Sequence, residues 1–143
     1  MLFPGYTTTL IQGSAMELEQ YFESTPGTGV LVTADADGNV NGALYSRTHF
    51  LENGQIAFIM ADRLSHHNLA SNPKAAYIFI KAGSKGAGKR LYLAKTHEES
   101  DPDMIQALRR RSRDSEKEGN EPKNKFIVYF TIEKVLPLIG AGE

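Results

Sequence analysis

Short apolar runs separated by turn signals predict that most of this chain is β-structure. Six segments have the length and the Val, Ile, Phe and Tyr content of strands, and Gly, Pro, Asn or Asp residues lie around them. Asp37-Gly38 and Asn53-Gly54 favour tight hairpin turns between the first three of these strands. The predicted strands are residues 29–34, 40–49, 56–61, 75–80, 91–95 and 126–132.

Three further stretches have the spacing and end signals of short helices. Residues 15–23 place their apolar side chains on one helical face. A second helix is expected from Ser65 as N-cap to Pro73, which would stop it. A third is expected to begin after Asp101 as N-cap, and the polar residues 109–125 that follow are expected to form a frayed helix end and a loop.

Closely spaced antiparallel hairpins with a few short helices favour a mainly β fold, a small barrel with peripheral helices, over a doubly wound sheet. The 143 residues suit one domain, and no repeat or interdomain linker divides them. We therefore expect a single domain that spans residues 1–143.

Composition excludes several function classes. The net charge is −1 and the pI is about 6.4, so no overall basic field favours nucleic acid or an anionic membrane. The chain has no cysteine, which excludes disulfides, thiolate metal sites and cysteine nucleophiles. No apolar run approaches the ~20 residues of a membrane-spanning helix, and Pro4 and Gly5 interrupt the only apolar segment near the start. A cytoplasmic protein is the expectation.

The candidate binding site lies where strand 56–61 leads into the second helix. A helix N-terminus presents unpaired N–H groups and a partial positive charge, so it can bind an anion. The Arg63 guanidinium and the Ser65 hydroxyl could complete such a site. The residues are equally compatible with an ordinary helix cap beside a surface arginine.

Two basic segments are candidates for contact with anions. Residues 83–89 match the first seven positions of a phosphate-binding P-loop, but Arg90 stands where Ser or Thr is needed and a strand follows. A solvated hairpin loop is one interpretation, and a lid with Lys85 and Lys89 over an anionic ligand is the other. Residues 109–113 are rich in arginine but lack interleaved aromatics, so a solvated face is favoured over a nucleic-acid site.

No catalytic constellation is visible in the sequence. His66 and His67 are adjacent and diverge on a helix, and His49 and His97 are isolated, so no metal site is predicted. There is no nucleophile elbow and no paired acid motif. This suits a protein whose chemistry belongs to a bound cofactor.

Taken together, these segments resemble the pyridoxamine 5′-phosphate oxidase-like family of FMN-binding split barrels. The most specific part is Ser65-x-x-Asn68-Leu69-x-x-Asn72-Pro73, which follows the third strand. The resemblance covers about residues 15–97 and 126–138, most of the chain, and also rests on residues 29–34 with the Asp37-Gly38 turn, 42–47, 56–62 and 130–135.

The resemblance implies a six-stranded antiparallel split barrel that forms a homodimer, with FMN at the subunit interface. It implies that the flavin phosphate is held where Arg63 and Ser65 lie, and Asn68 is expected among the cofactor-binding residues. Leu64 and His66 replace the basic neighbours that the family often has, and Lys85 or Lys89 could substitute for them. The residues expected to line the flavin ring and the ribityl chain are Tyr45, Ser46, Arg47, Thr48, Met60, Ala61 and Asp62.

The implied function is that of a flavin-dependent oxidoreductase, which passes hydride or electrons through the flavin N5 to a small molecule. The C-terminal Arg/His pattern of pyridoxamine 5′-phosphate oxidase itself is not found, so that reaction is not assigned. The alternatives are a non-enzymatic flavin or electron carrier, a split barrel that binds deazaflavin or haem, and an anion- or nucleic-acid-binding module.

Overall fold

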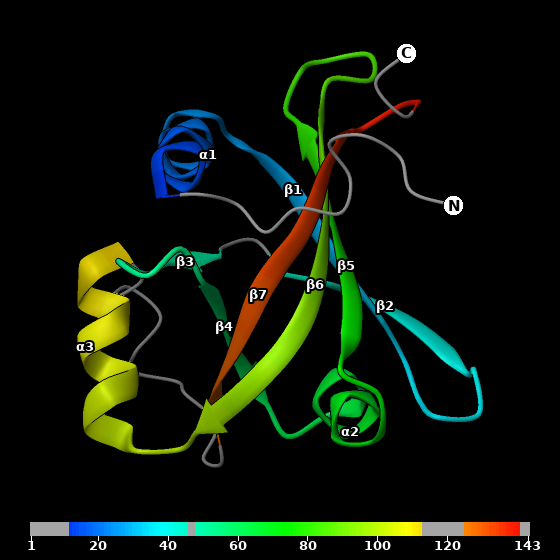
Figure 1. The fold of residues 1–143 in the computed structure, drawn as a ribbon, viewed down its shortest axis with the longest axis vertical. Coiled ribbons are helices and arrows are strands. Elements are labelled where there is room, and N and C mark those ends of the chain that lie inside the picture. The colour runs from blue at the N-terminus through cyan, green and yellow to red at the C-terminus, as the bar shows by residue number, and fades with distance from the viewer. Residues whose placement is uncertain (1–11, 46–47, 113–124, 141–143) are drawn as a thin grey trace.

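The computed structural model describes residues 12–45, 48–112 and 125–140, which form one seven-stranded antiparallel sheet and three helices (Figure 1). The elements are α1 (Gln12–Ser24), β1 (Gly27–Ala34), β2 (Val40–Leu44), β3 (His49–Phe50), β4 (Ile56–Ala61), α2 (Leu64–Ser71), β5 (Lys74–Lys81), β6 (Gly88–Glu99), α3 (Pro102–Ser112) and β7 (Lys125–Pro137). In the described residues, no helix is both long enough and apolar enough to span a bilayer.

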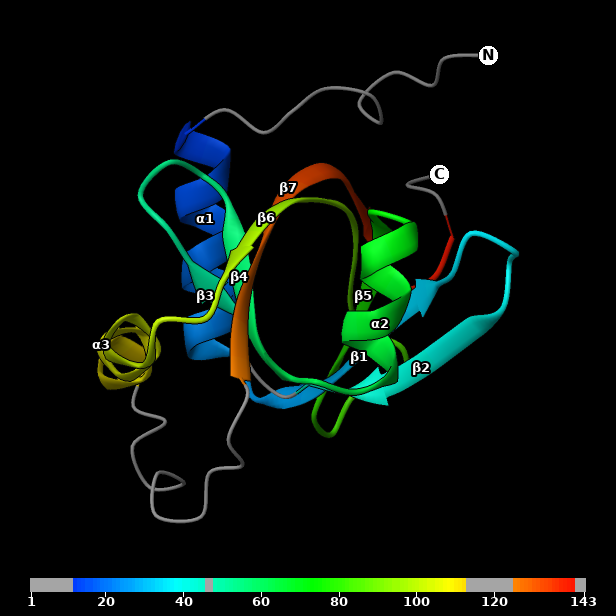
Figure 2. The same cartoon turned by 90° about the horizontal axis from the view of Figure 1, so that it is seen from below.

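The strands follow the order β2-β1-β5-β6-β7-β4-β3, and every neighbouring pair is antiparallel. The sheet curls around a central core without closing, because its edge strands β2 and β3 do not pair with each other (Figure 2). The predicted mainly β, antiparallel split-barrel architecture is therefore confirmed.

The predicted strand over residues 40–49 is wrong in one respect, because the structure divides it into β2 and β3. The chain leaves the sheet at Tyr45, whose backbone N–H donates a hydrogen bond to the Gly29 carbonyl at 2.9 Å. Sheet pairing resumes only at His49 and Phe50, opposite β4. The described chain therefore has seven strands where the sequence predicted six.

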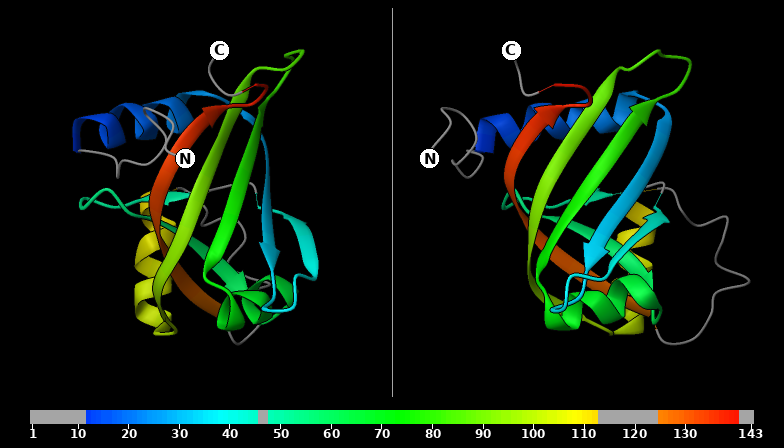
Figure 3. Two further views of the ribbon diagram at one scale, coloured as in Figure 1. Left: turned by 45° about the vertical axis from the view of Figure 1, so that its right-hand side comes forward. Right: turned by 90° about the vertical axis from the view of Figure 1, so that its right-hand side faces the viewer.

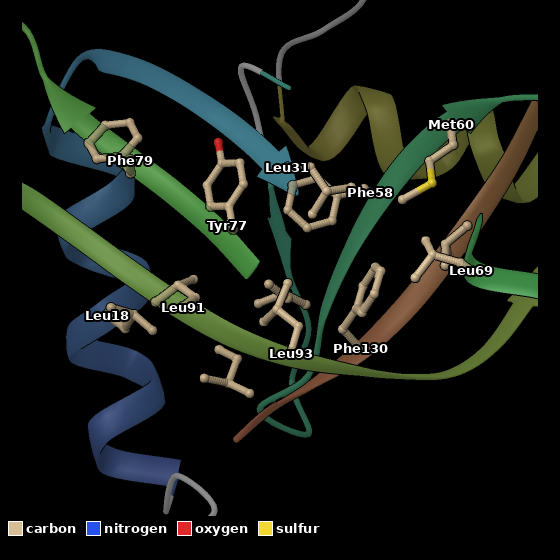
Figure 4. Close-up of a cluster of buried hydrophobic side chains, with 13 residues drawn as sticks. Leu18, Leu31, Phe58, Met60, Leu69, Tyr77, Phe79, Leu91, Leu93 and Phe130 are labelled. Atoms are coloured by element: carbon tan, nitrogen blue, oxygen red, sulfur yellow. The ribbon is translucent and has the colours of Figure 1, made fainter. Parts of the chain in front are cut away.

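The barrel interior is filled by side chains that alternate along the strands. On β1, for example, Leu31 and Thr33 point inward and are almost fully buried. Figure 4 shows large side chains from several strands that meet in one cluster. Tyr77, Phe58 and Phe130 are its largest fully buried side chains, and the ring centroids of Phe58 and Tyr77 are 5.0 Å apart. Burial of this apolar surface is the main stabilising contribution to the barrel.

Helices α1 and α2 lie toward opposite ends of the barrel (Figure 3). From α1, Leu18 is buried in the core and the Phe22 ring packs edge-on against Phe79, with centroids 4.8 Å apart. From α2, Leu69 enters the same core cluster, which also contains Met60. The two helices therefore cover core residues near opposite ends of the strands.

Helix α3 packs on the outside of the barrel. Its Ile105 and Leu108 form a second apolar cluster with residues of β4 and β7. The Asp101 carboxylate accepts a hydrogen bond from the Asp103 N–H at 2.9 Å, as expected of an N-cap. Arg109 is 5% exposed, so this part of the predicted polar helix end is buried; residues 113–124 lie outside the described residues.

Gly29 allows the close approach that directs the chain out of the sheet at Tyr45. The Tyr77 hydroxyl donates a hydrogen bond to the Tyr45 carbonyl at 2.7 Å, directly above Gly29. A Cβ atom at Gly29 would overlap that hydroxyl and crowd the carbonyl. A residue with a side chain at this position must therefore displace Tyr77 or Tyr45.

We expect Gly29→Ala to lower the free energy of unfolding by about 2–4 kcal/mol, from overpacking and a lost buried hydrogen bond. Urea denaturation measures it. Gly42→Ala is the matched control on β2, because a Cβ there would meet only Val30 Cγ1 at 3.6 Å, an ordinary contact. Equal midpoints for the two variants would contradict this role of Gly29.

Candidate functional site

The candidate site lies at the corner where β4 ends and α2 begins. Arg63 occupies the N-cap position with an extended backbone (φ −131°, ψ −165°), and no side chain among the described residues caps the helix. The first helical hydrogen bond runs from the His67 N–H to the Arg63 carbonyl at 2.9 Å. The N–H groups of the first turn are therefore not satisfied by a cap, which is the condition under which a helix end binds an anion.

The prediction of Ser65 as the N-cap is wrong, because α2 begins at Leu64 and Ser65 is its second residue. The Ser65 side chain is buried, with 3% of the residue exposed. It faces β2, where the Asn41 amide donates to the Ser65 hydroxyl at 3.4 Å. Ser65 therefore belongs to the wall of the corner and does not supply the cap.

A polar layer joins α2 to the first two strands. The buried Asn68 amide donates to the Thr33 hydroxyl at 3.1 Å. Thr33 of β1 is paired in register with Asn41 of β2, which contacts Ser65. Asn68, predicted as a cofactor-binding residue, thus holds α2 against the sheet from within. These hydrogen bonds fix the orientation of the first turn of α2 relative to the sheet.

Tyr45 joins this layer from the end of β2. Burial raises the pKa of Tyr45, whereas its hydrogen bond with Ser65 and the charge of Arg63 act in the opposite direction, and the pKa stays above its ordinary value. Both interactions require that Ser65 and Arg63 lie close to the Tyr45 hydroxyl. The structure therefore brings Tyr45, Arg63 and Ser65 together, three residues that the sequence grouped as one site.

The other predicted residues are distributed unevenly around this corner. Ala61 is half-buried at the end of β4, and Asp62 is exposed next to Arg63. Met60 is fully buried in the barrel core, so its side chain acts as a core residue. The Thr48 hydroxyl is buried and has no hydrogen-bond partner among the described residues. Ser46 and Arg47 lie outside the described residues.

Within one chain, Lys85 and Lys89 are not brought to this corner. They belong to the β5–β6 hairpin, at the end of the barrel away from α2 (Figure 3). The eight residues of β5 separate the two ends by about 25 Å. Lys89 Nζ instead lies 4.6 Å from the centroid of the Tyr21 ring of α1. The proposed lid over the anion site is therefore not formed within a single chain.

Sequence reasoning missed a charged cluster on the flank of the first turn of α2. His66 Nδ1 lies 3.0 Å from an Asp62 carboxylate oxygen, and Nε2 lies 2.9 Å from a Glu98 carboxylate oxygen. Glu98 also accepts a hydrogen bond from Lys95 at 2.6 Å. The i,i+4 spacing of Asp62 and His66 was a usable signal. Nothing in the sequence indicated that Glu98 of β6 would join them.

Glu98 is ionised in this cluster. Burial acts to raise the pKa of Glu98, but the hydrogen bonds and positive charges of Lys95 and His66 outweigh it, so the pKa lies below its ordinary value. Both ring nitrogens of His66 face carboxylates. In the described part of the chain, no group of three or more His, Asp or Glu side chains could hold a metal ion.

Solved structures with the same fold exist, although no protein-family model and no curated protein sequence matches the chain significantly. An FMN-binding protein from Syntrophomonas wolfei is 19% identical with a TM-score of 0.72, over 90% of this chain and 89% of that one. A pyridoxamine 5′-phosphate oxidase-like protein from Lactobacillus delbrueckii is also 19% identical, with a TM-score of 0.61 over 90% and 93% of the two chains.

Other neighbours bind different groups. A haem-binding protein from Mycobacterium smegmatis is 21% identical with a TM-score of 0.57, over 94% of this chain and 57% of that one. An F420 reductase is 17% identical with the same TM-score, over 82% and 94% of the two chains. At such identities the likeness is one of fold. The chain thus has the split-barrel fold of FMN-binding and pyridoxamine 5′-phosphate oxidase-like proteins.

Proposed function

We propose that this chain binds FMN, with the flavin phosphate at the first turn of α2. The observation that carries the proposal is the uncapped N-terminus of α2, next to the exposed arginine Arg63. The polar side chains of Asn41, Tyr45 and Ser65 lie beside it, and those of Asn41 and Tyr45 are hydrogen-bonded to Ser65. An FMN-binding protein of the same fold supports the choice of ligand.

The residues present fit a phosphate group. Main-chain N–H groups and a helix dipole favour a dianion, and the Arg63 guanidinium can donate two parallel hydrogen bonds to phosphate oxygens. Asn41 and Tyr45 offer neutral donors. Asp62 opposes binding through its negative charge.

FMN when bound would supply hydride or electron transfer, and we propose a flavin-dependent oxidoreductase that acts on a small molecule. The contribution of this chain is to hold the phosphate and orient the cofactor beside Tyr45. No described side chain at the corner is assigned as an acid or base. Steady-state oxidation of NADH or NADPH with added FMN separates an oxidoreductase from a flavin carrier, which would show no turnover with either donor.

Arg63→Ala should weaken FMN binding about ten- to a hundredfold, because a charge-assisted hydrogen bond contributes about 1.5–3 kcal/mol. Ser65→Ala should weaken it about threefold, because Ser65 supports the wall and is buried. Absorption spectra of the purified protein, followed by titration with FMN and observation of flavin fluorescence, measure both effects.

The controls remove a positive charge and a hydroxyl group elsewhere in the chain. Lys81→Ala removes an exposed charge at the far end of the barrel, and Ser71→Ala removes a hydroxyl at the other end of α2. Both should bind FMN like the wild type. A wild-type spectrum that does not change on addition of FMN would overturn the proposal, and haem or F420 would then be titrated, since neighbours of the same fold bind or use them.

A homodimer with the flavin at its interface is part of the proposal. The edge strand β2 presents Val40 and Leu44 with 76% and 75% of each residue exposed. Leu64, beside Arg63, is 53% exposed. Large exposed apolar side chains on an unpaired edge strand are typical of a contact surface. A second copy that covers this strip would lie next to the phosphate corner.

Light scattering after size-exclusion chromatography should give a mass of about twice the 15.8 kDa chain. Leu44→Asp should shift the protein to the monomer mass, because a buried unpaired charge destabilises an interface. Met16→Asp, which alters an exposed apolar residue on α1, is the matched control and should remain dimeric. A monomeric wild type would contradict the dimer.

A further inference from the structure

The His66 ring is held on three sides at the flank of the first turn of α2. Asp62, from the turn that follows β4, faces Nδ1 at 3.0 Å, and Glu98 of β6 faces Nε2 at 2.9 Å. The ring stacks on Phe126 of β7, with centroids 4.0 Å apart and planes 13° apart. The His66 side chain is only 14% exposed. Its orientation is therefore fixed by contacts with three elements.

This geometry suits the protonated ring. An imidazolium has an N–H on each nitrogen and can donate to both carboxylates, whereas a neutral ring donates to one and turns a lone pair toward the other. The other charges around the ring are the partial positive charge at the start of α2 and Lys95, which is paired with Glu98. Arg63 follows Asp62 in the chain, and Lys125 precedes Phe126 and lies opposite Ala61.

The protonation state of His66 sets the charge beside the phosphate corner. With His66 protonated, the four-residue cluster of Asp62, His66, Glu98 and Lys95 carries no net charge. With His66 neutral, the same cluster carries one negative charge, next to Arg63 and Ser65 in the chain. A net negative charge at this place repels a phosphate dianion.

We propose that His66 is a positioning and specificity-determining residue, whose protonated ring neutralises the Asp62–Glu98 pair and so favours phosphate-bearing flavin over riboflavin. The inference rests on the proposed function, because it concerns the same corner. The His66 side chain is engaged by Asp62, Glu98 and Phe126 and is not proposed to touch the ligand. It acts through charge and through the orientation of the first turn of α2.

The test compares the FMN dissociation constants of His66→Gln and wild type at about pH 5.5 and about pH 9, on either side of the usual titration range of histidine. The variant should bind about three- to tenfold more weakly at the lower pH, the effect of one charge through partly solvated protein. At the higher pH the two constants should be nearly equal. The phosphate of FMN titrates near pH 6. This affects the variant and the wild type equally, so it cancels in the ratio of their two dissociation constants.

Three controls separate the charge effect from a structural one. His67→Gln alters the adjacent exposed histidine, and its FMN dissociation constant should equal that of the wild type at both pH values, a variant-to-wild-type ratio of one. Riboflavin, which lacks the phosphate, should give a ratio of one at both pH values. The double variant His66→Gln/Glu98→Gln restores a neutral cluster and should regain wild-type affinity at the lower pH, which a merely structural role of His66 would not allow.

The outcomes are distinguishable. A wild type that binds no FMN at either pH overturns the proposed function and this inference with it. FMN binding with the same ratio at both pH values, an equal ratio for riboflavin, or no recovery in the double variant overturns this inference alone.

Discussion

Burial of both faces of β4 is the constraint on which the rest of the structure depends. Ile56, Phe58 and Met60 point into the barrel core, while Ala57 and Ile59 pack against the cluster formed with α3. A one-residue shift in its pairing with β7 would exchange these two faces. The register is therefore fixed, and with it the point after Ala61 where the chain leaves the sheet and α2 begins.

The position of the candidate site depends on this fixed point, after Ala61, where the chain leaves the sheet. Helix α2 can only be placed as it is because Leu69 enters the core while Asn68 hydrogen-bonds to Thr33 of β1. Its first turn is then held at the surface with Arg63 at the N-cap, and the described part of the chain supplies no capping side chain. Two opposing electrostatic effects meet there. The helix end and Arg63 favour an anion, and Asp62 disfavours one unless His66 offsets its charge.

Features that depend on local chemistry could be predicted from the sequence. Both turn signals lie in tight turns of the structure: the Gly38 N–H donates to the Asp35 carbonyl at 3.1 Å and the Gly54 N–H donates to the Leu51 carbonyl at 3.1 Å. The structure has a strand at each predicted position and the three predicted helices, although residues 40–49 form two strands and β7 extends beyond its predicted end to Pro137. The split-barrel fold is confirmed. These features are encoded by residues close together in the chain.

Features that depend on distant contacts could not be predicted. The break between β2 and β3 follows from Tyr77, which bonds to Tyr45 across 32 residues of sequence. His66 and Glu98 are also 32 residues apart. The burial of Met60 and Arg109 depends on what packs over each strand and helix. The ligand, the dimer and the roles of the site residues stay predictions.

The first turn of α2 is the proposed phosphate site. Amide chemical shifts of ¹⁵N-labelled protein, recorded as FMN and then inorganic phosphate are added, test this assignment most directly. We expect the Leu64, Ser65 and His66 amides to shift most with both ligands, since their N–H groups would donate to phosphate oxygens. Shifts confined to the β5–β6 hairpin, with these amides unchanged, would contradict it.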